Sequence, residues 1–331
     1  MDIQIDKAIL HILDKNAAMP VFSENFMDLT DDSTYKFIMN NIKKMYDDTT
    51  TRSGRFKQDS YVLSQIVNVK ETLMESSRSI AEFLYKFVNN QDAIPGGDLL
   101  FALAKVNDSN YLAIVKLNYK EGYTHSVDYS GEQVTNKIML HRVMLSAESA
   151  SNNEGVLINL DNKSLRILEK SYLIDGDRKN YFSEIFLQCG TEISKKESIK
   201  VMNDVAKEIT KKYFDEDFKK IAEVKKSIYE DIEESGSLKL ENVARKAFGD
   251  IEEVQKEYIE EVKKAGVRPR IEFGGEEPEK KFSKYKIKTD NGIELSLPMD
   301  IYKEKEAVEF IDNPDGTVSI LIRNVGKILS K

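Results

Sequence analysis

Leu99-Leu-Phe-Ala-Leu-Ala-Lys-Val106 and Tyr111-Leu-Ala-Ile-Val-Lys-Leu-Asn-Tyr119 are two strongly apolar runs, joined by Asn107-Asp-Ser-Asn110. The linking residues are typical of a tight turn, because their short polar side chains bond to nearby backbone groups. Strands that are apolar at successive positions, and not only at alternate ones, are covered on both faces. The stretch therefore predicts two central strands of a sheet, paired as a hairpin and buried on both sides.

The segments before this hairpin combine one strand with several helices. Ile3, Ile5 and Ile9 alternate with polar residues and predict an opening strand. Apolar residues at helical spacing then predict helices over 31–46, 59–69 and 71–89. A polar loop is expected at 49–54, between the first two helices.

A second hairpin is predicted after the central one, from strands 155–160 and 165–169. A two-residue turn at Asn162-Lys163 would place Leu160 opposite Leu165 and Ile158 opposite Ile167. Between the two hairpins, the sequence predicts a strand at 133–144 and then a flexible loop rich in Ser, Ala, Glu and Asn.

The last part of the chain is first helical and then returns to β structure. Four helices are predicted near 195–214, 216–234, 239–248 and 251–265, with glycines where they end. In the tail, a loop of Asp290-Asn291-Gly292 with Gly292 in the left-handed region would pair Ile287 with Leu295 and direct Lys286 outward. Another hairpin is expected around Asn313-Pro-Asp-Gly316.

These patterns predict an α+β protein with a mainly antiparallel sheet, packed helices, a helical middle region and a small C-terminal β module. A chain of 331 residues exceeds the usual size of a single core. We expect an α+β domain at 1–190, a helical region at 191–266 and a small β-hairpin module at 267–331.

Composition favours a cytoplasmic protein that binds no membrane. The single cysteine excludes an internal disulfide and fits a reducing compartment. The opening residues have neither a basic leader nor an apolar segment of signal-peptide length. The longest apolar run, at 99–104, is far shorter than the roughly 20 residues that cross a bilayer.

Enzyme signatures are largely missing from the sequence. There is no GxxxxGK[ST], GxGxxG, HExxH or GxSxG motif. A catalytic site would need a pocket that gathers Cys189, one of the three histidines (His11, His125 and His141) and carboxylates. The apolar neighbours of Cys189 instead favour a buried, inert thiol. We therefore predict no catalytic residue, no cofactor and no metal site.

Asp175-Gly176-Asp177 could hold a cation, but it lacks the further oxygen ligands that calcium or magnesium requires. A tight turn is favoured, with Asp177 capping a helix over 178–188. Arg178 and Lys179 would then lie in the first turn of that helix, where free backbone N–H groups can receive a phosphate. A solvated pair beside a turn fits the sequence equally well.

Other basic residues are candidates for binding DNA, although the net charge of −8 means that any such surface must be local. Arg52-Ser-Gly-Arg55-Phe-Lys57 combines three cations, a flexible glycine and an aromatic ring. The basic segment 263–288 is denser, with nine basic against four acidic residues. The preceding residues 250–262 contain six acids and one lysine, so internal neutralisation is the competing explanation. The nine candidates are Lys263, Lys264, Arg268, Arg270, Lys280, Lys281, Lys284, Lys286 and Lys288.

The segment 156–191 resembles the bacterial 37-kDa nucleoid-associated protein family, in which an Arg-Lys pair leads into an aromatic-rich helix that ends near a glycine. Arg178-Lys179, the aromatics at 181–186 and Gly190 carry this resemblance. Similar patterns extend over Ile9-Leu10-His11, 97–106, 111–117, 292–297 and 315–317.

The resemblance implies a cytoplasmic, nucleoid-associated protein that is linked to DNA and has no known catalytic centre. Arg178 and Lys179 are the motif residues that carry over. Two hypotheses follow. The chain either binds double-stranded DNA through local basic surfaces on an acidic body, or is a protein-interaction factor recruited to the nucleoid by a DNA-processing partner. Oligomerisation is left open.

Overall fold

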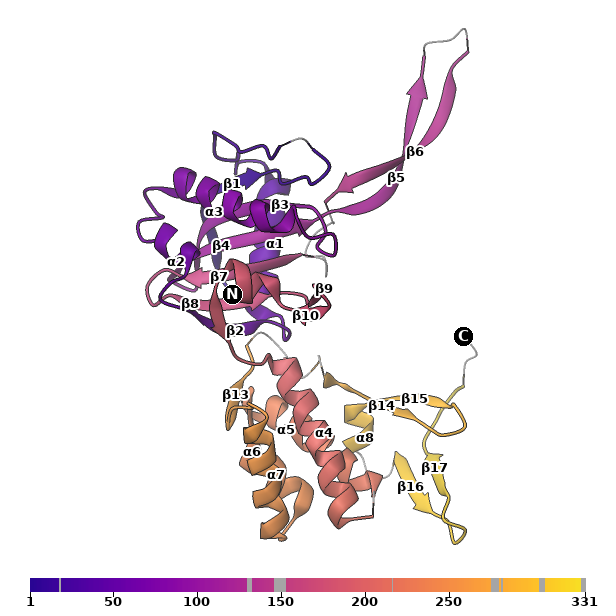
Figure 1. Ribbon diagram of the computed structural model, residues 1–331. Coiled ribbons are helices and arrows are strands. Elements are labelled where there is room, and N and C mark those ends of the chain that lie inside the picture. The colour runs from indigo at the N-terminus through magenta and orange to yellow at the C-terminus, as the bar shows by residue number, and fades with distance from the viewer. Residues whose placement is uncertain are drawn as a thin grey trace. The chain divides into compact units, whose positions relative to one another are not determined.

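The computed structural model describes residues 1–17, 19–129, 133–145, 153–215, 217–274, 280, 282–303 and 307–328. The chain divides into two compact units, Met1–Lys195 and Lys196–Lys331 (Figure 1). Buried apolar clusters lie within each unit. Within the described residues, no helix is long and apolar enough to span a membrane.

The first unit is built on a seven-stranded sheet in which each strand is antiparallel to its neighbours. The strand order is β1-β3-β4-β7-β8-β2-β11. The prediction of a mainly antiparallel sheet is therefore confirmed. The strands are β1 (Ile3–His11), β2 (Arg52–Phe56), β3 (Gly97–Val106), β4 (Ser109–Asn118), β7 (Glu154–Asn159), β8 (Ser164–Leu168) and β11 (Cys189–Thr191).

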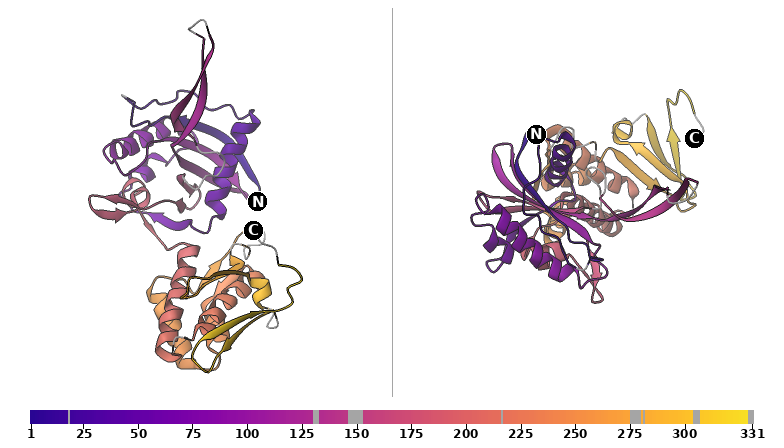
Figure 2. Two further views of the ribbon diagram at one scale, coloured as in Figure 1. Left: turned by 90° about the vertical axis from the view of Figure 1, so that its right-hand side faces the viewer. Right: turned by 90° about the horizontal axis from the view of Figure 1, so that it is seen from above.

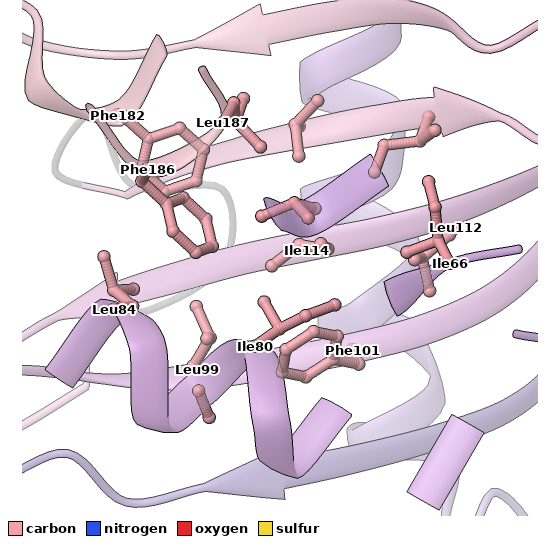
Figure 3. Packing of buried hydrophobic residues seen from close by; sticks show 14 of the residues in the cluster. Ile66, Ile80, Leu84, Leu99, Phe101, Leu112, Ile114, Phe182, Phe186 and Leu187 are labelled. Carbon is pink, nitrogen blue, oxygen red and sulfur yellow. The ribbon is translucent and has the colours of Figure 1, made fainter. Parts of the chain in front are cut away.

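Helices cover both faces of this sheet, which explains the unbroken apolar character of β3 and β4. Leu99 and Phe101 of β3 face one side, where they pack with Ile80 and other apolar residues (Figure 3). Leu100 faces the other side and packs in a cluster with Ile42. The central hairpin is buried on both sides, as predicted. The first face carries α2 (Tyr61–Gln65), α3 (Leu73–Val88) and the π-helix η1 (Phe182–Phe186), and the second carries α1 (Asp32–Asp47).

The predicted register of the β7–β8 hairpin is wrong by two residues. Leu165 pairs with Ile158 and not with Leu160. The loop is longer than expected because the side-chain oxygen of Asn159 accepts hydrogen bonds from the backbone N–H groups of Asp161 and Asn162, at 2.9 and 3.0 Å. A shift of two residues keeps every side chain on its expected face.

Several strands occupy segments where none was predicted. Residues 52–56 were expected to begin within a polar loop, but they form β2 between β8 and β11. Gly54 permits this close packing: a Cβ there would lie 3.0 Å from the carbonyl oxygen of Gly190 and 3.1 Å from Cδ1 of Ile167. Another unpredicted strand is β5 (Lys120–Asp128), which pairs with β6 (Thr135–Met144).

The β5–β6 arm, residues 120–128 and 135–144, is a two-stranded sheet of its own. It projects from the rest of the first unit in every view (Figures 1 and 2). The strand predicted at 133–144 is confirmed as β6. Most of the flexible loop predicted after it, at 146–152, lies outside the described residues.

The predicted helix over 178–188 is wrong in its first part. Asp177–Lys179 forms strand β10, which pairs with β9 (Tyr172–Ile174). Asp175 and Gly176 have φ values of 54° and 85°, and two successive positive φ values are the mark of a two-residue hairpin turn. A turn is therefore present, as predicted, but it joins two strands. Helical structure begins only at Tyr181 and continues in η1 from Phe182.

The second unit contains the four predicted helices and both predicted hairpins. Ile287 pairs with Leu295 and Gly292 has a φ of 89°, as predicted. Tyr285 and Leu297, on the inner face of that hairpin, pack with Tyr229 of α5. The elements are α4 (Lys195–Tyr213), α5 (Phe218–Ser235), β12 (Ser237–Lys239), α6 (Leu240–Phe248), α7 (Glu252–Lys264), β13 (Arg270–Glu272), β14 (Lys284–Lys288), β15 (Glu294–Pro298), α8 (Met299–Lys303), β16 (Val308–Asp312) and β17 (Val318–Ile322).

Candidate nucleic-acid interface

Arg178 and Lys179 lie on strand β10 and not at a helix N-terminus. The free N–H groups expected beside them are therefore not provided by a helix, and that argument for a phosphate site is wrong. Lys179 Nζ lies 3.7 Å from Oδ2 of Asp175. Arg178 is exposed and forms no ion pair with any residue that the structure describes.

Arg52, Arg55 and Lys57 do not form a flexible basic loop, because they belong to or follow strand β2. Side chains along a strand point alternately to its two faces, so Arg52 and Arg55 lie on opposite faces. Arg52 turns toward Glu169, with 3.6 Å between Nη1 and Oε1, whereas Arg55 and Lys57 are exposed. Burial raises the pKa of Glu169 to about 7, while the Ser183 hydrogen bonds and Arg52 act in the opposite direction.

Much of the basic segment 263–288 is neutralised by nearby carboxylates. Arg268 and Lys280 also have interaction partners, and Lys281 lies outside the described residues. Internal neutralisation, the competing explanation from sequence, therefore accounts for a large part of the segment. The measured N···O pairs are Lys263–Glu241 at 3.8 Å, Lys264–Glu261 at 2.6 Å, Arg270–Glu272 at 2.5 Å and Lys288–Glu294 at 3.3 Å.

Lys284 and Lys286 differ from the rest of the segment. Both are exposed on β14, and neither forms an ion pair with a described residue. Together with Lys288 they occupy alternate positions of one strand, so the three side chains leave the same face. The opposite face carries Tyr285 and Ile287, which pack inward. We call Lys284, Lys286 and Lys288 the β14 lysine row.

The residues that a nucleophilic site would need are not brought together. Cys189 lies on β11 and His11 on β1, the two opposite edges of the seven-stranded sheet, and the other two histidines lie on the β5–β6 arm. The thiol of Cys189 donates to the carbonyl oxygen of Ser183 at 3.5 Å, and burial raises its pKa to about 12. Among the described residues, no group of three or more His, Cys, Asp or Glu side chains could hold a metal ion.

His11 has a structural environment. Its Nδ1 accepts the backbone N–H of Ser23 at 3.1 Å, which leaves the proton on Nε2 to be donated to Oγ of Ser77 at 2.9 Å. Burial lowers the pKa of His11 to about 4, with a smaller contribution from the charge of Arg78. The imidazole is thus a neutral link between strand β1 and helix α3.

A comparison with known families identifies the family of this chain. A family model described as nucleoid-associated protein YejK matches residues 9–329. This chain belongs to that family. The resemblance inferred from the sequence is therefore confirmed, and the match includes both units and every candidate cation. No curated protein matches the chain.

The first unit of this nucleoid-associated protein also contains a buried polar cluster that sequence analysis missed. Glu154 is fully buried, and its carboxylate accepts hydrogen bonds from Asn118, Tyr172, Tyr181 and the backbone N–H of Lys170. The sequence did contain a sign of this cluster, because Glu154 is a charged residue at the start of an apolar strand and Lys116 interrupts another.

Lys116, close to this cluster, is 1% exposed. Its ammonium group donates to the carbonyl oxygen of Pro95 at 2.8 Å and to the side-chain oxygen of Asn118. Burial lowers the pKa of Lys116 to about 8, while the charge of Glu154 acts in the opposite direction. The opposite charges of Lys116 and Glu154 therefore stabilise each other inside the sheet, and neither side chain is a candidate for DNA binding.

Proposed function

We propose that this chain is a non-catalytic, cytoplasmic nucleoid-associated protein that binds double-stranded DNA directly. The β14 lysine row is the contact surface, and one observation carries the proposal: two of its three lysines are exposed and form no ion pair with a described residue. Alternate residues of a strand lie about 6.6 Å apart. The row therefore presents a line of positive charge that can follow the phosphates of a duplex.

The negative net charge of the chain does not prevent it from binding DNA. Charges farther apart than about 8–10 Å are largely screened at physiological salt, so a local row of lysines acts on DNA almost independently of distant carboxylates. Contacts to phosphate give affinity and orientation without reading bases. We thus expect binding to depend strongly on salt and weakly on sequence.

The test compares two double variants of equal charge change within the same unit. Lys284→Gln with Lys286→Gln removes exposed lysines that form no ion pair with a described residue, and Lys263→Gln with Lys264→Gln removes lysines held by Glu241 and Glu261. Affinity for a short duplex is measured between about 50 and 200 mM salt. Each phosphate contact contributes about 0.9 to the slope of log K against log salt. The first variant should flatten the slope by about 1.8, and the control should leave it nearly unchanged.

Two results would contradict the proposal. The first is a wild-type protein with no salt-sensitive DNA binding at low ionic strength. The second is an equal loss of slope in both double variants. The first result favours the alternative function, a protein-interaction factor recruited to the nucleoid by a DNA-processing partner. Affinity capture from a nucleoid extract would then search for that partner.

A further inference from the structure

The loop between β14 and β15 contains the single Asn-Gly pair of the sequence, Asn291-Gly292 (Figure 1). Asp290, Asn291 and Gly292 are all exposed. Gly292 has a φ of 89°, and a Cβ added to it would meet no described atom within 4 Å. The peptide bond between Asn291 and Gly292 is therefore open to water.

An asparagine that precedes a glycine can lose its side-chain amide without an enzyme. The backbone nitrogen of the glycine bonds to Cγ of the asparagine, the bond from Cγ to the amide nitrogen breaks, and ammonia leaves with the proton of the attacking nitrogen. One water molecule then opens the five-membered imide ring, which gives aspartate or isoaspartate. Glycine favours the attack because no Cβ crowds the approach of its backbone. The net change replaces one neutral amide by one carboxylate.

Two hydrogen bonds in the loop bear on this reaction. The hydroxyl of Thr289 donates to Oδ1 of Asn291 at 2.5 Å. That oxygen gains negative charge while Cγ is attacked, and a donor already in place stabilises such a transition state. The backbone N–H of Gly292 donates to the carbonyl oxygen of Thr289 at 3.1 Å, and this bond must open first. Water can replace it, because a hydrogen bond at the surface contributes little net stability.

Asn162 provides an internal comparison. It is exposed in the β7–β8 loop, and the residue after it, Lys163, also has a positive φ, of 59°. The two asparagines thus share exposure and the conformation of the next residue. They differ in the Cβ of Lys163 and in the partner of Oδ1, which for Asn162 is the backbone N–H of Ser164 at 2.9 Å. We therefore expect Asn291 to react much faster than Asn162.

The position of Asn291 links the reaction to the β14 lysine row. Asn291 follows Lys288 by three residues, so their Cα atoms are at most about 11 Å apart. The screening length is about 10 Å at 0.1 M salt and longer in more dilute salt. Glu294 Oε1 already lies 3.3 Å from Nζ of Lys288. A new carboxylate at residue 291 would further lower the positive potential at this end of the row.

We propose that Asn291 deamidates without an enzyme and that the new carboxylate weakens the binding of the β14 lysine row to DNA. The second half rests on the proposed function of that row, whereas the first half does not. Isoaspartate has a further effect, because it adds one carbon to the main chain of the loop that sets the register of this hairpin. An aged molecule would accordingly bind DNA less tightly than a newly made one.

The first test follows the mass of the protein and not its binding to DNA. The full-length protein is incubated for several days at physiological temperature and mildly alkaline pH, and its peptides are then examined by mass spectrometry. Deamidation appears as the small mass increase that replacing NH2 by OH gives. The Asn291 peptide should convert at least tenfold faster than the Asn162 peptide of the same sample. Asn291→Gln should stop the change, because its longer side chain would have to close a less favourable six-membered ring.

The second test measures the effect of the charge on DNA affinity. Asn291→Asp introduces the carboxylate directly, and Asn291→Gln is the matched uncharged control. Affinity for a short duplex is measured between about 50 and 200 mM salt. One charge about 10 Å away in water changes a binding constant roughly twofold. Asn291→Asp should therefore bind about twofold more weakly than the wild type at the lowest salt and differ less at the highest, while Asn291→Gln should match the wild type.

Two outcomes would overturn the proposal. One is an Asn291 peptide that keeps its mass or converts no faster than the Asn162 peptide. The other is equal DNA affinity of Asn291→Asp and Asn291→Gln at low salt, when binding by the wild type is salt-sensitive. A wild type without salt-sensitive binding would instead contradict the proposed function, and with it the second half of this proposal. The mass measurement would still decide the first half.

Discussion

The hydroxyl of Tyr181 donates to Oε2 of Glu154 across 2.9 Å, and both side chains are fully buried. Tyr172 donates to the same oxygen at 3.0 Å from a partly exposed position. A carboxylate that leaves water without new donors loses several kcal/mol. The two phenols, with Asn118 and the backbone of Lys170, replace the lost water and bind β7 to the segment that follows β8.

Removing one phenol should therefore destabilise the first unit by an amount that depends on burial. Tyr181→Phe should lower the free energy of unfolding by about 2 kcal/mol, because a buried hydrogen bond to a charged group contributes about 1.5–3 kcal/mol. Tyr172→Phe is the matched control and should lose less, since water can reach its partly exposed site. Urea unfolding measures both values. A larger loss in Tyr172→Phe would contradict this assignment.

The pKa of Glu169 predicts an unusual response to acid. Burial raises this pKa from 4.5 to about 7, so the folded protein binds a proton there more readily than the unfolded chain. Between pH 7 and 4.5, this carboxyl therefore makes the fold more stable as pH falls. Glu169→Gln removes that gain. The variant should lose up to about 3 kcal/mol more stability than the wild type over this range.

His11 opposes Glu169 over an overlapping range. Its pKa is lowered from 6.5 to about 4, so the stability that comes from its neutral form is lost as pH falls through this interval. The two groups partly cancel in the wild type. Urea unfolding from pH 7.5 to 4.5 should show a steeper acid loss in Glu169→Gln. Curves of the same shape in variant and wild type would contradict the raised pKa.

Gly97 should tolerate no side chain. A Cβ at this position would lie 2.6 Å from the carbonyl oxygen of Leu117 on the neighbouring strand, and backbone cannot easily move away. Gly97→Ala should lower the free energy of unfolding by about 1–3 kcal/mol. Gly190→Ala is the control within the same sheet, because no atom lies within 4 Å of its added Cβ. It should change stability by less than about 0.5 kcal/mol, and equal losses would refute the steric explanation.

Sequence patterns predicted the strand register correctly where residues of the turn itself determine the backbone conformation. The register of the β14–β15 hairpin is right because Gly292 must take a left-handed conformation. The register of β7–β8 is wrong because side-chain bonds from Asn159 extend the loop. Strand β2 was missed because its residues are mostly polar, and its place depends on Gly54 fitting between β8 and β11.

The candidate interface was harder to predict, because ion pairing is a tertiary property. The basic segment 263–288 was chosen because it is rich in positive charge, yet Lys263 forms an ion pair with Glu241 of another helix. The exposed apolar side chains of the β5–β6 arm could have been recognised in the sequence, since Tyr123, Val127 and Tyr129 fall at alternate positions. The further division of the second unit near residue 266 stays a prediction.

The two outer strands of the seven-stranded sheet limit how molecules can aggregate. An open strand edge is a template for another chain. On β1, the pairing is irregular between Ile5 and Lys7, and the N–H of Met27 already bonds to the carbonyl of Ala8 at 2.8 Å. β11, at the other side, is only three residues long. Even at high concentration, neighbouring copies would therefore find little on this sheet from which to polymerise into fibres.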